Sequence, residues 1–168
     1  VNRSAPPSSN RSGRSWEDAV PELRDALSIA DQPISTIQEV WVAEGVYTPT
    51  DISAETTATF AMIDNVAIRG GFGGHEADLA EREVDADGLP VRATVFSGDL
   101  GGGNRSQHVL TANGVTLGAL DGVVVSGGFG DQGGGLVVDT SVLLIENTLF
   151  SANDSNLGGG ALAIRQTS

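Results

Sequence analysis

The chain has 168 residues, enough for one domain with a hydrophobic core of its own. Its formal net charge is −13 at pH 7, with nine arginines and no lysine, which excludes nucleic acids and anionic membranes as expected partners. It has no cysteine and no apolar run of membrane-spanning length, so disulfides, thiolate metal sites and membrane insertion of this segment are excluded as well.

The N-terminal part divides into a polar segment and a helical cap. Residues 1–15 are rich in Ser, Asn, Arg and Pro, and they predict an extended or loosely ordered segment. Residues 16–38 follow as the cap, in which apolar residues recur at the spacing of a helix. This spacing predicts a helix over 21–30, with Pro21 at its first position, where a missing N–H costs nothing. Trp16 is expected to pack just before this helix.

From residue 39 onward the chain consists of short apolar runs bounded by Gly, Asn, Asp or Ser. Many of these runs are rich in β-branched residues, and they are too short for helices and too closely spaced for βαβ units. They therefore predict strands. The first run contains Val40, Val42 and Val46 and leads into a turn at Thr48-Pro49-Thr50. The later runs are residues 59–62, 66–68, 94–96, 108–110, 115–120, 123–125, 136–138, 142–145, 149–150 and 162–164.

A repeat connects these runs. A shift of 25 positions places Leu120-Asp121-Gly122 on Ile145-Glu146-Asn147, and the same shift places the glycines 133–135 on the glycines 158–160. Two matches at one offset indicate a structural unit stacked on its neighbour. Less regular copies begin at Ile68, Phe96 and Val125, at spacings of 28 and 29 residues. Residues 39–168 are therefore predicted to form about five turns of a parallel β-helix.

Residues at equal phase in such a repeat should lie above one another, because each strand pairs in parallel with the strand one turn earlier, about 4.8 Å away. One inward apolar column is predicted, and it contains Val42, Ile68, Phe96, Val125 and Phe150. A glycine column is predicted at a corner, and it contains Gly70, Gly98 and Gly127.

The two ends of this solenoid are expected to differ. The open end of a solenoid exposes strand edges, and the helix over 21–30 is placed to cover the first turn. The last run, 162–164, is followed only by Gln166-Thr167-Ser168. We therefore expect the solenoid to continue beyond residue 168 or, as the alternative, to stack on another chain.

Four parts of the chain resemble known proteins: Ser15-Trp16 with Asp25-Ala26-Leu27, residues 40–50, residues 68–76, and residues 144–153 followed by the glycines 158–160. They resemble bacterial right-handed parallel β-helix proteins of the pectate-lyase-like superfamily, and more closely large surface proteins related to the polymorphic outer membrane proteins. The resemblance implies an all-β fold, a right-handed single-stranded parallel β-helix with an N-terminal capping α-helix. It also implies a secreted or cell-surface location in a bacterium.

Enzymes of that superfamily cut polysaccharides with calcium-binding carboxylates and a basic residue, or with aspartates as acid and base. Asp121 and Glu146 are related by the 25-residue shift, so they should lie on adjacent turns as candidate Ca²⁺ ligands. No arginine is expected to share their phase nearby, and solvated surface carboxylates are the alternative interpretation. The acidic residues of the 76–88 run are expected to be solvated loop charges. No catalytic residue and no required cofactor is predicted, and calcium is the one candidate.

Two functions stay open. The first is a non-catalytic extracellular module, structural or adhesive, that serves as a rod, stalk, surface-layer or filament component. Its expected partners are glycans, cell-surface ligands or further copies of itself joined end to end. The second is a polysaccharide lyase or glycoside hydrolase of the pectate-lyase-like fold, which requires a catalytic groove.

Overall fold

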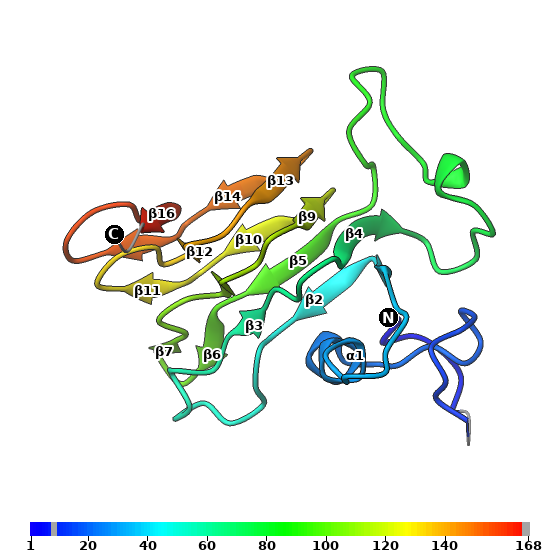
Figure 1. Cartoon of the computed structure of the whole chain (residues 1–168), viewed down its shortest axis with the longest axis horizontal. Coiled ribbons are helices and arrows are strands. Elements are labelled where there is room, and N and C mark those ends of the chain that lie inside the picture. The colour runs from blue at the N-terminus through cyan, green and yellow to red at the C-terminus, as the bar shows by residue number, and fades with distance from the viewer. Residues whose placement is uncertain (8–9, 166–168) are drawn as a thin grey trace.

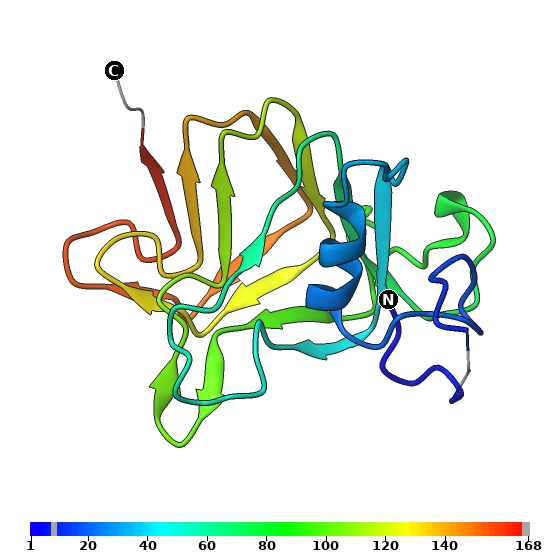
Figure 2. The same cartoon turned by 60° about the horizontal axis from the view of Figure 1, so that its bottom comes forward.

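Most of the chain winds into parallel coils of short strands, with one helix at the N-terminal end (Figures 1 and 2). The computed structural model describes residues 1–7 and 10–165; Gln166-Thr167-Ser168, which follow the last predicted strand, lie outside the described residues. The predicted all-β solenoid with a capping helix is confirmed.

Three long sheets, each of four parallel strands, form the faces of the solenoid. Sheet A contains β1 (Glu39–Ala43), β4 (Ala67–Phe72), β9 (Gly118–Asp121) and β13 (Leu143–Glu146), in that order. Sheet B contains β2 (Gly45–Tyr47), β5 (Thr94–Ser97), β10 (Val124–Ser126) and β14 (Leu149–Ser151). Sheet C contains β3 (Phe60–Ala61), β8 (Leu110–Asn113), β12 (Leu136–Asp139) and β16 (Leu162–Arg165).

Smaller elements decorate the connections between these sheets. β6 (Asp99–Gly101) and β7 (Asn104–Arg105) form an antiparallel hairpin, and β11 (Phe129–Gly130) pairs in parallel with β15 (Asp154–Ser155). The long connection from β4 to β5, residues 73–93, contains the short 3₁₀ helix η1 (Leu79–Glu81). At the outer edge of β1, the Ala43 N–H donates to the Val1 carbonyl at 2.9 Å, so the first residue is hydrogen-bonded to the edge of sheet A.

The strand registers define an inward column on each of the three sheets; in sheet C it is Phe60, Leu110, Leu136 and Leu162. In sheet A the column is Val40, Ile68, Leu120 and Ile145; in sheet B it is Tyr47, Phe96, Val125 and Phe150. The predicted single column is therefore right for Phe96, Val125 and Phe150. It is wrong for Ile68, which lies on sheet A, and for Val42, which lies at an irregularity of β1. Ile68 and Phe96 belong to one coil, because the 73–93 connection fills the spacing between them.

The glycine prediction fails at the same place. Gly98 and Gly127 are neighbours on adjacent coils, and Gly127 has a φ of +78°, which favours glycine. A Cβ on Gly98 would lie 2.8 Å from the Cα of Gly128. Gly70 instead lies in sheet A, where a Cβ would meet Val123 Cγ1 at 2.6 Å. The predicted column of three glycines is therefore wrong for Gly70.

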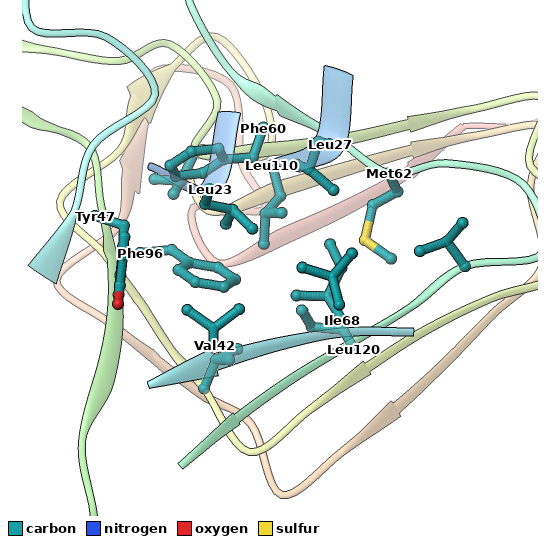
Figure 3. Packing of buried hydrophobic residues seen from close by; sticks show 14 of the residues in the cluster. Leu23, Leu27, Val42, Tyr47, Phe60, Met62, Ile68, Phe96, Leu110 and Leu120 are labelled. Atoms are coloured by element: carbon teal, nitrogen blue, oxygen red, sulfur yellow. The ribbon is translucent and has the colours of Figure 1, made fainter. Parts of the chain in front are cut away.

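The helix α1 (Leu23–Ala30) covers the N-terminal opening of the coils, as predicted. Its buried residues include Leu23 and Leu27, which point into the same apolar cluster as Phe60 and Phe96 (Figure 3). The helix begins two residues later than predicted, because Glu22 is extended at φ −109° and ψ 134°. Pro21 therefore precedes the helix, and the Glu22 carboxylate pairs with Arg3.

The opposite end of the coils is open in the part of the chain that the structure describes. The outer edges of β13, β14 and β16 pair with no described strand, and these strands lie far from α1 (Figure 1). Ile145, Phe150 and Leu162 are only partly buried, whereas Leu120, Val125 and Leu136 one coil earlier are 0% exposed. Among the described residues, no helix has the length and apolarity needed to cross a membrane.

Candidate functional site

Asp121 and Glu146 lie side by side on β9 and β13, as the 25-residue shift predicts. Their environments differ, since Asp121 is 4% exposed whereas Glu146 is exposed. Asp121 Oδ2 accepts from Arg82 Nη1 at 2.8 Å and from Arg69 Nη1 at 3.3 Å. Asp121 Oδ1 accepts from Asn147 Nδ2 at 2.8 Å. Both carboxylate oxygens of Asp121 are therefore engaged within the protein.

The expectation that no arginine shares the phase of these carboxylates is wrong. Arg69 is the direct register partner of Asp121 between β4 and β9. The sequence did contain the signal, because Arg69 follows Ile68 as Asp121 follows Leu120. Arg82 arrives from the 73–93 connection, which has no counterpart in the repeat. Among the described residues no group of three or more His, Asp or Glu side chains is placed to hold a metal ion, and calcium binding stays a prediction.

Arg82 clamps the 73–93 connection onto the outer face of sheet A. Its guanidinium pairs with Asp121, donates to the Gly70 carbonyl at 3.1 Å, and lies over the Phe72 ring, 5.7 Å from its centroid. Burial raises the pKa of Asp121, but the hydrogen bonds from Asn147 and Arg82 and the charges of Arg82 and Arg69 outweigh it. The pKa of Asp121 is therefore held below its ordinary value, and the carboxylate serves as a charged anchor.

The turn at the start of the same connection has a second internal anchor. The Glu76 carboxylate accepts the backbone N–H groups of Gly73 at 2.6 Å, Gly74 at 3.0 Å and His75 at 2.9 Å. Burial raises the pKa of Glu76, yet these donors lower it below its ordinary value. Glu76 is only 5% exposed, so the prediction of a solvated loop charge is wrong for this residue. Trp16 Nε1 donates to the Glu76 carbonyl at 2.8 Å, which ties the N-terminal segment to this turn.

A groove of about 490 Å³ lies among the connections that lead from sheet B to sheet C; we call it the loop groove. Its side chains include Arg105, His108, Phe129, Asp131, Asn156 and Arg165. His108 belongs to the predicted strand run 108–110, and neither Arg105 nor Arg165 was a predicted site residue. These residues come from the β5–β8, β10–β12 and β14–β16 connections and from β16. The 25-residue shift relates only Asp131 and Asn156, whose side chains are hydrogen-bonded at 3.1 Å.

Arg105 organises the loop groove. Its guanidinium donates to the carbonyls of Gly127 and Gly128, each at 2.7 Å, and of Ala152 at 2.9 Å. It also lies 5.4 Å from the centroid of the Phe129 ring. His108 Nδ1 lies 3.0 Å from the Gly133 carbonyl, so it is the protonated nitrogen and Nε2 is left for another partner. The loop groove thus combines the Phe129 ring and the Arg105 guanidinium, both held in place, with the charged side chains of Asp131 and Arg165.

A comparison with family models finds no match for this chain, and neither do comparisons with curated proteins and with solved structures.

Proposed function

We propose that this chain is a non-catalytic structural or adhesive module, a helix-capped section of an extracellular β-solenoid rod. The observation that carries this proposal is the contrast between the two ends of the coils. At one end α1 buries Leu23 and Leu27 against the core. At the other end three strand edges and the partly buried Ile145, Phe150 and Leu162 face outward. Such an end is suited to receive a further coil.

We expect the open end to be covered by a further β-coil with apolar residues in phase with Ile145, Phe150 and Leu162. The register favours it, because β13, β14 and β16 pair residue by residue with the coil before, without irregularity. A further coil in the same register would continue all three sheets and cover their unpaired edges. The resemblance to bacterial surface proteins supports an extracellular, bacterial setting.

An added coil should stabilise the protein. We expect that a second copy of residues 140–165, appended directly after Arg165, raises the free energy of unfolding by about 2 kcal/mol or more, because it buries side chains that are now partly exposed. Urea unfolding followed by circular dichroism measures this change. The matched control is the same extension with serine at the copied Leu143, Ile145, Phe150 and Leu162. An unchanged midpoint for the apolar extension, or equal gains for both extensions, would overturn the proposed role of this end.

A second candidate function is the binding or cleavage of polysaccharides at the loop groove. The observation that favours it is Phe129, whose side chain is 39% exposed and fixed by Arg105 beside His108 and Asp131. If the chain is the structural or adhesive module, we expect no product release from polygalacturonate or alginate, with or without Ca²⁺. If the chain binds either polysaccharide without cutting it, Phe129→Ala should weaken that binding about tenfold, the loss of roughly one good contact. Product release that disappears in a His108→Ala variant would instead establish the second function.

A further inference from the structure

A cavity of about 610 Å³ lies beside α1, and we call it the cap cavity. Its walls come mainly from residues 12–16, α1 and β1, and they are completed by Val1, Val20, Ile37 and the turn at Glu76 and Ala77. Ala26 and Ile29 of α1 and Val40 of β1 provide apolar surface. This volume falls within the range of about 300–1,000 Å³ that small-molecule sites occupy, and a mostly apolar wall is typical of them.

Two tryptophans, Trp16 and Trp41, form the aromatic part of the wall. Their ring centroids are 6.4 Å apart, and Trp41 stacks on Phe72 at 4.6 Å with an angle of 8° between the planes. Both indole N–H groups are used within the protein, by the Glu76 carbonyl and the Glu39 carboxylate, each at 2.8 Å. The rings are therefore held in place, and what they offer to a ligand is apolar ring surface.

The charged groups that line the cap cavity differ in whether they have partners within the protein. The Val1 amino group donates to the Trp41 carbonyl. Glu39 accepts from Trp41 with one oxygen and from Arg69 Nε at 3.2 Å with the other. The Glu76 carboxylate is turned toward the backbone N–H groups of its own turn. The Arg14 guanidinium has no acceptor among the described residues. In a chain with a net charge of −13, the unused charge at this cavity is positive.

We propose that the cap cavity binds a small carboxylic acid with an aromatic or branched aliphatic body. The body packs against Trp16, Trp41 and Ile29, and the carboxylate pairs with Arg14. A guanidinium is suited to this contact because it donates two parallel hydrogen bonds to a carboxylate. The site is separate from the open end and from the loop groove, so it stands or falls independently of the proposed function. A bound acid would join residues 12–16 to α1 and stabilise the folded chain.

The test uses the intrinsic fluorescence of the protein, because Trp16 and Trp41 are its only two tryptophans and both line the cavity. We expect 3-phenylpropanoate to change the tryptophan emission saturably, with a Kd between about 10 µM and 1 mM for a ligand of this size. The neutral amide of the same shape, 3-phenylpropanamide, should bind at least about tenfold more weakly, since it lacks the charge.

Arg14→Gln is the decisive variant, because Arg14 is exposed and its replacement leaves the core intact. We expect it to weaken binding of the acid about tenfold and to leave binding of the amide unchanged. Arg11→Gln is the control: it removes the same charge three residues earlier, from a side chain that lies outside the cavity wall and donates to the Ala19 carbonyl, and it should change neither affinity. The absence of a saturable signal, equal affinities for acid and amide, or equal effects of the two variants would overturn the proposal.

Discussion

Replacement of Phe96 by alanine should lower the free energy of unfolding by about 3–5 kcal/mol, the cost of a large cavity in a packed core. Phe96 is 0% exposed and stands between Tyr47 and Val125 in the inward column of sheet B. Its ring meets Tyr47 edge to face, with centroids 6.4 Å apart, and packs on Phe60 at 5.4 Å. The loss follows because these rings come from three different strands and cannot close the cavity together. Urea unfolding at pH 7 measures it.

Two other phenylalanines provide matched controls for this measurement. Phe150 continues the same column but is only partly buried at the open end, so Phe150→Ala should cost less, about 1.5–3 kcal/mol. Phe129 is 39% exposed in the loop groove, and Phe129→Ala should cost less than about 1 kcal/mol. A loss at Phe129 as large as at Phe96 would contradict the register. A loss at Phe150 equal to that at Phe96 would show that the open end is covered in solution.

The regular part of the solenoid was predictable from the sequence because stacking imposes like residues at like phase. The 25-residue shift correctly paired Leu120 with Ile145 and Val125 with Phe150. Parallel strands of adjacent coils place these side chains one above the other in a shared core, so the pattern repeats in the sequence. The helix was predictable for a similar reason, since its buried face repeats at helical spacing.

For the earlier coils the predicted alignment is wrong, because one local motif occurs at two different positions around the coil. Ile68 and Phe96 are each followed two residues later by a glycine, Gly70 within β4 and Gly98 directly after β5, because a neighbouring segment approaches the backbone closely at both positions. The likeness reports this shared close approach, whereas the two residues lie on different sheets. The spacing of 28 residues resembled one turn only because the 73–93 connection is nearly as long as a regular coil.

The candidate sites also contain residues that the repeat predicts and residues that it does not. The adjacency of Asp121 and Glu146 was predictable, and Arg69 would have been found by aligning Ile68 with Leu120. Arg82 and the buried role of Glu76 had no such signal, because the 73–93 connection has no repeated partner and is fixed by tertiary contacts. The loop groove and the cap cavity are likewise assembled from segments whose proximity depends on the completed fold.

Loss of the Arg82–Asp121 pair should destabilise the protein almost as much as the loss of Phe96. The two side chains are 9% and 5% exposed, and removal of one partner from a buried pair costs about 3–5 kcal/mol because the other charge stays buried. Arg69 also contacts Asp121, so Arg82→Met should fall at the lower end of this range. The matched control is Arg92→Met in the same connection, whose ion pairs with Glu44 and Glu83 are exposed and worth less than about 1 kcal/mol.

The pH dependence separates the charge of Asp121 from its shape. Because its pKa is lowered in the folded state, its stabilising contribution is complete above its ordinary pKa of 3.8 and is lost as the pH falls through the lower folded value. Asp121→Asn keeps the shape but not the charge, so its deficit against the natural chain should be full at pH 7 and shrink as the pH falls below 3.8. Urea midpoints measured from pH 7 down to the acid limit of the folded state test this. A deficit that stays constant across that range would mean that Asp121 acts through packing alone, and that Arg82 holds the connection without its help.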